Sequence, residues 1–198
     1  MPISAKEKTN PQLISLEEAA ALIQSEDSIW VGSGFSIPNL FLDKLADRYE
    51  TLHDVTVLGI NYMNYSKIMD SKYVNIFHVI SFFESAMFRI FNSKAENIEY
   101  IKKPYRPYSK TICEQFKTNT MVVEVCPPDE NGFCNVGATG KIITPYLNNC
   151  ESIVKKIAVI NEFQRPAFDD GDIISIHLSD FDYVCNCNHN VFKRTLIK

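Results

Sequence analysis

Residues 122–137 read VVEVCPPDENGFCNVG, and this stretch combines the two patterns on which the fold depends. Its first residues continue a short, β-branched run that begins at Met121. Such a run, without polar alternation, is typical of a strand buried on both faces. From Cys126 to Gly140 the proline, glycine and asparagine content is too high for regular structure. The stretch therefore predicts a buried strand at 121–125 that ends in an irregular loop.

The same alternation of apolar strands and amphipathic helices recurs along the whole chain. A helix is expected to begin at Ser15, which forms a capping-box pattern with Glu18, and another after Pro38. Further helices are expected at 84–94 and 111–117, and further strands at 28–31, 54–60, 73–80, 98–101, 157–160, 173–176 and 183–185. The alternation predicts an α/β domain whose mostly parallel sheet is flanked by helices.

The overall composition excludes several classes of protein. The chain has 198 residues, of which 45% are hydrophobic and 22% charged, as in globular proteins that bury a core. The net charge of -4 and the lack of a Lys/Arg cluster argue against nucleic-acid partners. No apolar run is long enough to cross a bilayer, and the N-terminus MPISAKEKTN has no signal-peptide hydrophobic region. We therefore expect a cytoplasmic protein without a membrane partner.

Two further expectations follow from composition. Residues 1–12 are polar and expected to be flexible, whereas residues 13–198 are expected to form a single domain. The six cysteines show no spacing typical of a small secreted scaffold, so they are predicted to be reduced thiols.

The segment 30–38, WVGSGFSIP, places bare backbone at the end of a predicted strand. It matches only the first two glycines of the dinucleotide fingerprint GxGxxG, because Pro38 stands at the third, so nicotinamide-cofactor binding is disfavoured. Two interpretations remain open. One is a tight turn with positive φ at one or both glycines; the other is a wall of backbone N–H groups for a carboxylate or thioester oxygen. In parallel sheets ligands bind at the carboxyl ends of the strands, where this loop is expected.

The segment 122–137 resembles the V-x-x-S-P-P-D-x-x-G-[YF]-x-[ST]-x-G stretch of the acetyl-CoA hydrolase/transferase family. This family includes the butyryl-CoA:acetate and 4-hydroxybutyrate CoA-transferases. Other segments resemble the family in the same order: ISLEEAAALIQSEDSIWVGSGFSIP, FHVISFFESAMFR, IAVINEFQRP and SIHLSDFDYV. These segments place the following residues at family positions: Arg89, Asn161, His177, Ser179 and Asp182. The resemblance runs from about residue 13 to residue 190.

The resemblance implies a CoA-transferase N-terminal half. Family members consist of two similar α/β halves, and a glutamate of the second half attacks the acyl-CoA thioester. This attack releases CoA thiolate and leaves an acyl-glutamyl anhydride. CoA thiolate then returns to the glutamyl carbonyl, which releases the donor acid and gives a glutamyl-CoA thioester, and the acceptor acid completes the exchange. The resemblance thus implies that no catalytic residue lies in this chain, that coenzyme A or acyl-CoA is a substrate rather than a resident cofactor, and that a second half acts in cis or as a separate subunit. We also expect a homo-oligomer.

The loops at the carboxyl ends of the strands are expected to form one wall of the site for the acyl group and carboxylate. The predicted substrate-binding residues are Gly32, Ser33, Gly34, Phe35, Asn61, Pro127, Asp129, Asn131, Gly132 and Asn161. Glu130 is a weaker candidate nucleophile. The segment Glu130-Asn131-Gly132 resembles the Ser-Glu-Asn-Gly motif of another CoA-transferase branch, but Asp129 replaces the serine, so a solvated loop carboxylate is favoured.

Several observations leave alternatives open. Cys126, Asn135 and the order Arg165-Pro166 depart from the family pattern, which leaves the acyl group undefined. No metal is expected, because Cys185, Cys187 and His189 lack a second ligand pair. His78 is expected to be a hydrogen-bonded core residue, and the segment KPYRPY at 103–108 either contacts a CoA phosphate or packs as a surface loop. The alternative function is a non-catalytic module that binds a CoA-like ligand or a protein partner.

Overall fold

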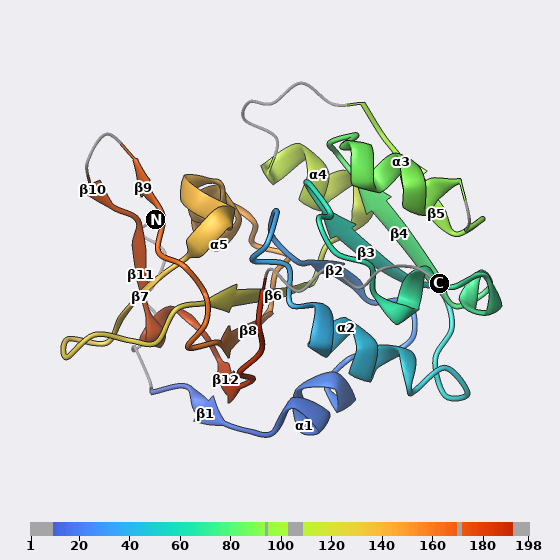
Figure 1. The fold of residues 1–198 in the computed structure, drawn as a ribbon. Coiled ribbons are helices and arrows are strands. Elements are labelled where there is room, and N and C mark those ends of the chain that lie inside the picture. The colour runs from blue at the N-terminus through green and yellow to red at the C-terminus, as the bar shows by residue number, and fades with distance from the viewer. Residues whose placement is uncertain (1–9, 94, 103–108, 170–171, 192–198) are drawn as a thin grey trace.

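The computed structural model describes residues 10–93, 95–102, 109–169 and 172–191, and these contain an eight-stranded sheet (Figure 1). The strand order is β1-β12-β8-β6-β2-β3-β4-β5, and every neighbouring pair is parallel. The strands of this sheet are β1 (Gln12–Leu13), β2 (Ser28–Trp30), β3 (Val55–Gly59), β4 (Phe77–Ser81), β5 (Ile98–Tyr100), β6 (Thr120–Val125), β8 (Lys155–Ile160) and β12 (Tyr183–Asn186). The predicted α/β fold with a mostly parallel sheet is confirmed.

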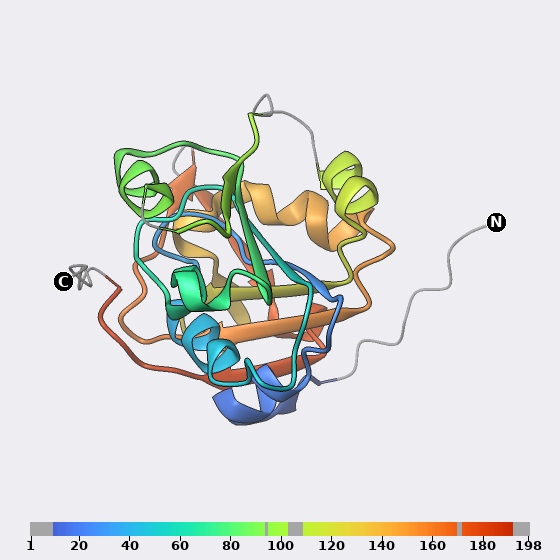
Figure 2. The same ribbon diagram turned by 90° about the vertical axis from the view of Figure 1, so that its right-hand side faces the viewer.

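Helices cover both faces of the sheet (Figures 1 and 2). The α-helices are α1 (Leu16–Ala21), α2 (Asn39–Ala46), α3 (Ala86–Asn92), α4 (Ser109–Phe116) and α5 (Ile143–Asn149). Short 3₁₀ helices occur as η1 (Lys67–Met69), η2 (Ser71–Tyr73), η3 (Gly137–Ile142) and η4 (Leu178–Asp180). The buried residues of α1, α2 and α3 belong to one apolar cluster, and those of α4 and α5 to a second cluster.

The continuous apolar strands follow from this two-sided burial. Along β6, Val122 belongs to the first cluster and Val123 to the second, because successive side chains of a strand point to opposite faces. On the second face, Tyr146 of α5 stacks on Trp30 of β2 with ring centroids 4.0 Å apart. A strand with a helix layer on each side needs apolar residues at every position, so it shows no alternation.

The N-terminal boundary differs slightly from the expectation. The capping box is confirmed, because the Ser15 hydroxyl accepts from Glu18 N and Glu18 Oε2 accepts from Ser15 N. Gln12, however, pairs with Tyr183 in the sheet, although it lies in the segment expected to be flexible. Residues 1–9 lie outside the described residues. Ordered structure therefore begins before residue 13.

Residues 126–140, which were expected to be irregular, contain the short strand β7 (Phe133–Asn135), and the structure has two small antiparallel sheets besides the main sheet. Strand β7 pairs antiparallel with β11 (Ser175–His177), while β9 (Phe168–Asp169) pairs antiparallel with β10 (Asp172–Ile173). Strand β7 is too short to produce a pattern, and its partner lies about forty residues away in sequence. Neither η3 nor α5 was predicted from the sequence, and the predicted start of β4 at residue 73 is too early, because Tyr73 ends η2.

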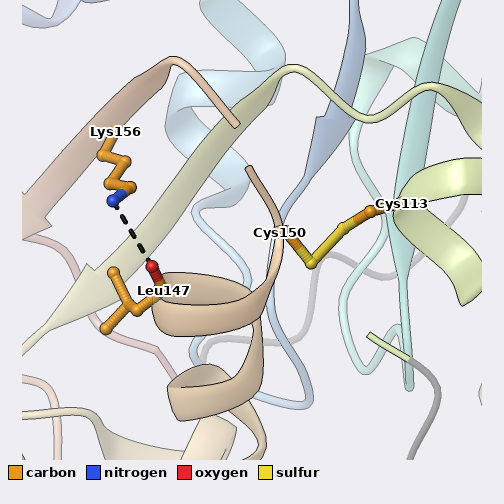
Figure 3. Close-up of a disulfide and its surroundings, with 4 residues drawn as sticks. All are labelled: Cys113, Leu147, Cys150 and Lys156. Atoms are coloured by element: carbon orange, nitrogen blue, oxygen red, sulfur yellow. Dashed lines mark hydrogen bonds between the residues drawn. A yellow bond between two sulfur atoms is a disulfide. The ribbon is translucent and has the colours of Figure 1, made fainter. Parts of the chain in front are cut away.

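The prediction that all six cysteines are reduced thiols is wrong for two of them. Cys113 in α4 and Cys150, which follows α5, form a disulfide (Figure 3). Their Cα atoms lie 6.1 Å apart, within the range that a disulfide spans. The packing of α4 against α5 creates this proximity, and a sequence separation of 37 residues gives no sign of it. The other four cysteines are buried free thiols: Cys126, Cys134, Cys185 and Cys187.

Candidate functional site

The glycine loop, residues 31–38, leaves the sheet at the carboxyl end of β2. Gly32 and Gly34 have φ values of 83° and 63°, so the predicted turn with positive φ is confirmed at both positions. A Cβ atom on Gly32 would lie 2.6 Å from Thr139 Oγ1, and one on Gly34 would lie 3.2 Å from Ala138 Cβ. Backbone conformation and the close approach of residues 138–139 therefore both require glycine here.

The backbone N–H groups of this loop already have partners inside the chain. Ser33 N donates to Thr139 Oγ1 at 3.2 Å, and Gly34 N donates to Asn61 O at 2.9 Å. Asn61 follows β3, the neighbour of β2, and its side-chain Oδ1 is buried without a partner. Asn61 thus lies beside the glycine loop, as predicted. A ligand oxygen that binds to Ser33 N or Gly34 N must replace an existing hydrogen bond.

The predicted site residues of the second loop form a separate hairpin between β6 and β7. Asp129 Oδ1 accepts from Asn131 N and Phe133 N, each at 2.9 Å, and Gly132 has a φ of 82°. Asn131 O accepts from His177 Nε2 at 3.0 Å. Pro127, Asp129 and Asn131 are exposed, and Figure 1 shows the hairpin projecting from the sheet, away from β2.

The two loops thus leave the same end of neighbouring parallel strands, but their contacts differ. Thr139 and Ala138, which follow β7, touch the glycine loop, while Asp129, Asn131 and Gly132 shape the hairpin and contact His177. Glu130 lies exposed at the hairpin tip. It has neither the burial nor the neighbouring donors that activate a carboxylate nucleophile.

Glu124, which the sequence analysis missed, is a fully buried carboxylate in β6. Its Oε1 accepts from Asn161 Nδ2 at 2.9 Å and from Gln164 Nε2 at 3.1 Å. Its Oε2 lies 2.7 Å from His189 Nε2. A carboxylate in a low-dielectric interior needs such partners, because burial without them is very unfavourable.

Asn161 holds the turn that follows β8, as the sequence predicted. Its Nδ2 donates to Glu124 Oε1 and to His189 O, the second at 3.0 Å. Its Oδ1 accepts from Phe163 N at 3.0 Å and from His189 N at 3.1 Å. Through these hydrogen bonds Asn161 joins β6, the turn after β8 and the segment after β12.

Gln164 joins this network to the glycine loop. Its Nε2 donates to Glu124 Oε1 and also to Phe35 O at 3.2 Å. The structure therefore brings together Gly32–Phe35, Asn61 and Asn161 from the predicted set, and adds Glu124, Gln164, Thr139 and His189.

The electrostatics of the network favour a charged His189. Burial acts to lower the pKa of His189, but the hydrogen bond and negative charge of Glu124 outweigh burial, so the pKa is raised above its ordinary value of 6.5. Burial, followed by the charge of Glu124, raises the pKa of Cys187 to about 11 and also raises that of Cys126. Below this raised pKa, His189 is protonated and forms an ion pair with the Glu124 carboxylate. The neighbouring thiols of Cys126 and Cys187 stay protonated over the same pH range.

Gly137 allows the close packing of Gln164 against the glycine loop, which leads to a prediction. Its φ is 53°, and a Cβ atom would lie 2.6 Å from Ser36 Oγ and 2.9 Å from Gln164 Cδ. We expect Gly137→Ala to lower the free energy of unfolding by about 1–3 kcal/mol and to shift the amide NMR signals of residues 32–36. Gly140→Ala is the matched control. Gly140 also has positive φ, but a Cβ atom on Gly140 would lie 4.0 Å from its nearest neighbour, Ile174 Cδ1. Unchanged loop signals in Gly137→Ala would contradict the contact.

Other residues at family positions have structural partners. His177 Nδ1 accepts from Ser179 N at 3.1 Å, and His177 Nε2 lies 3.0 Å from Asn131 O. Asp182 Oδ2 accepts from Lys156 N at 2.8 Å. A pocket of about 390 Å³ next to His177 is lined by Phe133, Thr144, Leu147, Ser175, Ile176, Ser179 and Asp180.

The prediction that His78 is a hydrogen-bonded core residue is wrong, because 53% of its side chain is exposed and its Nε2 lies 3.8 Å from Asp54 Oδ1. The apolar residues around His78 suggested that its side chain is buried and hydrogen-bonded. In the structure His78 is the exposed position of β4. Arg89 Nη1 lies 3.6 Å from Glu84 Oε2 on the surface. The segment 103–108 lies outside the described residues.

The described residues contain no group of three or more His, Cys, Asp or Glu side chains able to hold a metal ion. Cys185 and Cys187 are both buried. Within the same part of the chain, no helix has the length and apolarity needed to span a bilayer.

The chain is thus an α/β domain with an all-parallel main sheet, and its buried polar network lies at the carboxyl ends of the strands. The family model described as acetyl-CoA hydrolase/transferase N-terminal domain matches residues 4–193. The chain therefore belongs to the acetyl-CoA hydrolase/transferase family, as the sequence resemblance implied. No curated protein matches the sequence.

Solved structures show the same fold at low sequence identity. RipA from Yersinia pestis is 18% identical with a TM-score of 0.75, and the match covers 94% of this chain and 44% of that chain. A 4-hydroxybutyrate CoA-transferase from Porphyromonas gingivalis is 17% identical with a TM-score of 0.65, covering 91% and 40%. A variant of the decarboxylase AibA/AibB is 11% identical with a TM-score of 0.55, covering 90% and 84%. This chain spans less than half the length of the first two proteins.

Proposed function

We propose that this chain is the N-terminal half of a CoA-transferase that moves CoA between an acyl-CoA and a short-chain carboxylate such as acetate, butyrate or 4-hydroxybutyrate. Family membership and the fold shared with a 4-hydroxybutyrate CoA-transferase support the proposal. The observation that carries it is the glycine loop, whose two buried, positive-φ glycines form a turn at the carboxyl ends of the strands that leaves Ser33 and Phe35 partly exposed. The adjoining loops hold this backbone in place through Thr139, Asn61 and Gln164.

In the proposed mechanism this chain orients the substrate, and the second half supplies the nucleophile. The catalytic glutamate attacks the thioester carbonyl, and the negative charge develops on the carbonyl oxygen. Gly32–Phe35 and Asn61 form the wall against which the acyl group lies, and Asn161 holds the neighbouring turn. The hairpin residues Pro127, Asp129, Asn131 and Gly132 form an outer rim of the substrate site. Coenzyme A enters and leaves as a substrate, and no cofactor stays bound.

We propose that the second half docks over the carboxyl edge, either in cis or as a separate subunit. Phe83 and Phe163, which follow β4 and β8, have 49% and 59% of their surface exposed. Large exposed aromatic side chains at one edge of a sheet are typical of an interaction surface.

The match to AibA/AibB covers most of that chain, so the fold also occurs in a chain of similar length. A cytoplasmic location and a homo-oligomeric assembly complete the proposal.

Exchange of labelled acetate into acetyl-CoA tests the proposal. We expect no exchange by this chain alone, and exchange once the C-terminal half encoded with it or beside it is present. Titration of the isotope-labelled chain with acetyl-CoA should shift the amide signals of residues 32–36 and 61. Exchange by the chain alone that is lost in Glu130→Ala would instead make Glu130 the nucleophile. Acyl-CoA binding without exchange in the complete protein would support the non-catalytic module.

A further inference from the structure

The carboxylate of Glu124 has no part in the transfer chemistry proposed above, yet it is the centre of the hydrogen-bond network at the carboxyl edge. Its side chain is fully buried in the middle of the parallel sheet. Its donors are Asn161, Gln164 and His189. A buried charge costs stability unless its partners satisfy it, so these donors are constrained to face it.

Two contacts connect Glu124 to the end of the glycine loop. Gln164 Nε2 lies 3.1 Å from Glu124 Oε1 and 3.2 Å from Phe35 O, so one amide group donates to both oxygens. The backbone N–H of Glu124 donates to Ser36 O at 3.2 Å. The positions of the Phe35 and Ser36 carbonyl groups are thus set by the residue that carries the buried carboxylate.

Two further contacts connect Glu124 to residues 187–191, which we call the crossing segment. His189 makes the ion pair with Glu124 at 2.7 Å, and Cys187 N donates to Ile160 O at 2.8 Å. At the end of the segment, Val191 O accepts from Asn64 Nδ2, and Asn64 lies beyond the end of β3. The crossing segment therefore runs from the end of β12 past β8 and β6 to the loop after β3. Figure 1 shows it rising from β12 towards the centre of the sheet.

We propose that Glu124 is a positioning residue of the acyl site: it holds the glycine loop through Gln164 and the crossing segment through His189. The inference rests on the proposed function, because the glycine loop is the substrate wall in that proposal. The carboxylate touches no substrate in this arrangement. It acts on the geometry of backbone groups that do, and those groups must be held to within fractions of an ångström for efficient catalysis.

The charges around His189 make the second link dependent on pH. Glu124 faces His189 from β6, and its charge acts also on the thiols of Cys126 and Cys187. Glu17 and Lys44 act on Cys187 from α1 and α2 with opposite signs. The thiols remain neutral up to high pH, since burial raises their pKa values. The charge of the second link is therefore lost as the pH rises through the raised pKa of His189.

Nuclear magnetic resonance of the isotope-labelled chain tests the two links separately. In Gln164→Met the link to Phe35 is lost, so we expect hydrogen exchange at residues 34–37 to become about tenfold faster or more, with the His189 titration midpoint unchanged. In Glu124→Gln the charge is lost while an acceptor oxygen remains, so we expect the His189 midpoint to fall towards or below 6.5.

Asp27→Asn is the matched control for these variants. Asp27 is a buried carboxylate at the amino end of β2, where it accepts from Gln24 N, Asn119 Nδ2 and Lys155 Nζ. We expect this variant to change neither loop exchange nor the His189 midpoint. Unchanged loop exchange in Gln164→Met, or an unchanged midpoint in Glu124→Gln, would overturn the positioning role. Acetyl-CoA titration of the unmodified chain is read on the same amides, and its failure would reject the proposed function while leaving the positioning result in place.

Discussion

Replacing His189 by alanine should lower the free energy of unfolding by about 3 kcal/mol at pH 6, as measured by urea denaturation. The variant leaves the Glu124 carboxylate fully buried, with only the amide groups of Asn161 and Gln164 as donors. Loss of one partner from a buried ion pair typically costs about 3–5 kcal/mol, because an uncompensated charge remains. The lower end of this range of costs applies to His189→Ala, since 17% of the His189 side chain is exposed.

The pH dependence of this effect has a definite sign. The pKa of His189 is raised in the folded state, so the ion pair contributes its full stability below the ordinary value of 6.5. That contribution is lost as the pH rises through the raised pKa of the folded state. The difference in unfolding free energy between the unmodified chain and His189→Ala should therefore be largest near pH 6 and shrink towards pH 9.

His78→Ala provides the control for a surface histidine. His78 lies 3.8 Å from Asp54 and has 53% of its side chain exposed, so its loss should cost less than about 1 kcal/mol. The double variant Glu124→Gln/His189→Ala should recover part of the lost stability, because it no longer buries an unpaired charge. A cost for His189→Ala no greater than that for His78→Ala would contradict the buried ion pair.

The architecture could be predicted because local patterns alone determine it. The runs of β6 and β8 are short, β-branched and without alternation, which is typical of a strand with a layer on each side. The capping box at Ser15 fixes the start of α1 in the same local way. By contrast, β7 depends on pairing with β11, and neither segment is long enough to show a periodicity of its own.

The site was only partly predictable, for a related reason. A turn with positive φ at one or both of Gly32 and Gly34 was one of two interpretations of the sequence, since glycine tolerates this conformation without a steric cost, and the structure has it at both positions. The network depends on contacts between residues far apart in the chain: Glu124 and His189 are separated by 65 residues. One signal was present in the sequence. A glutamate in the apolar run MVVEV must be paired if the strand is buried, and this requirement points to partners at the same edge of the sheet.

Replacing both Cys113 and Cys150 by alanine should lower the free energy of unfolding by about 4 kcal/mol and the melting temperature by about 10 °C. The disulfide closes a loop over a sequence separation of 37 residues, so its loss gives the unfolded chain many more conformations. Thermal unfolding with and without dithiothreitol measures the effect. The reductant should lower the melting temperature of the unmodified chain and leave that of the double variant unchanged.

The disulfide also sets a condition on the proposed cytoplasmic location, because the cytoplasm keeps most thiols reduced. Cells broken in the presence of an alkylating reagent would preserve the native state of each thiol. The denatured chain should then show four alkylated cysteines, the free thiols Cys126, Cys134, Cys185 and Cys187, with two more released by reduction. Six alkylated cysteines would mean that the bond is open in the cell. In that case α4 and α5 are held together by apolar packing alone, and the protein in the cell has the lower stability expected of the double variant.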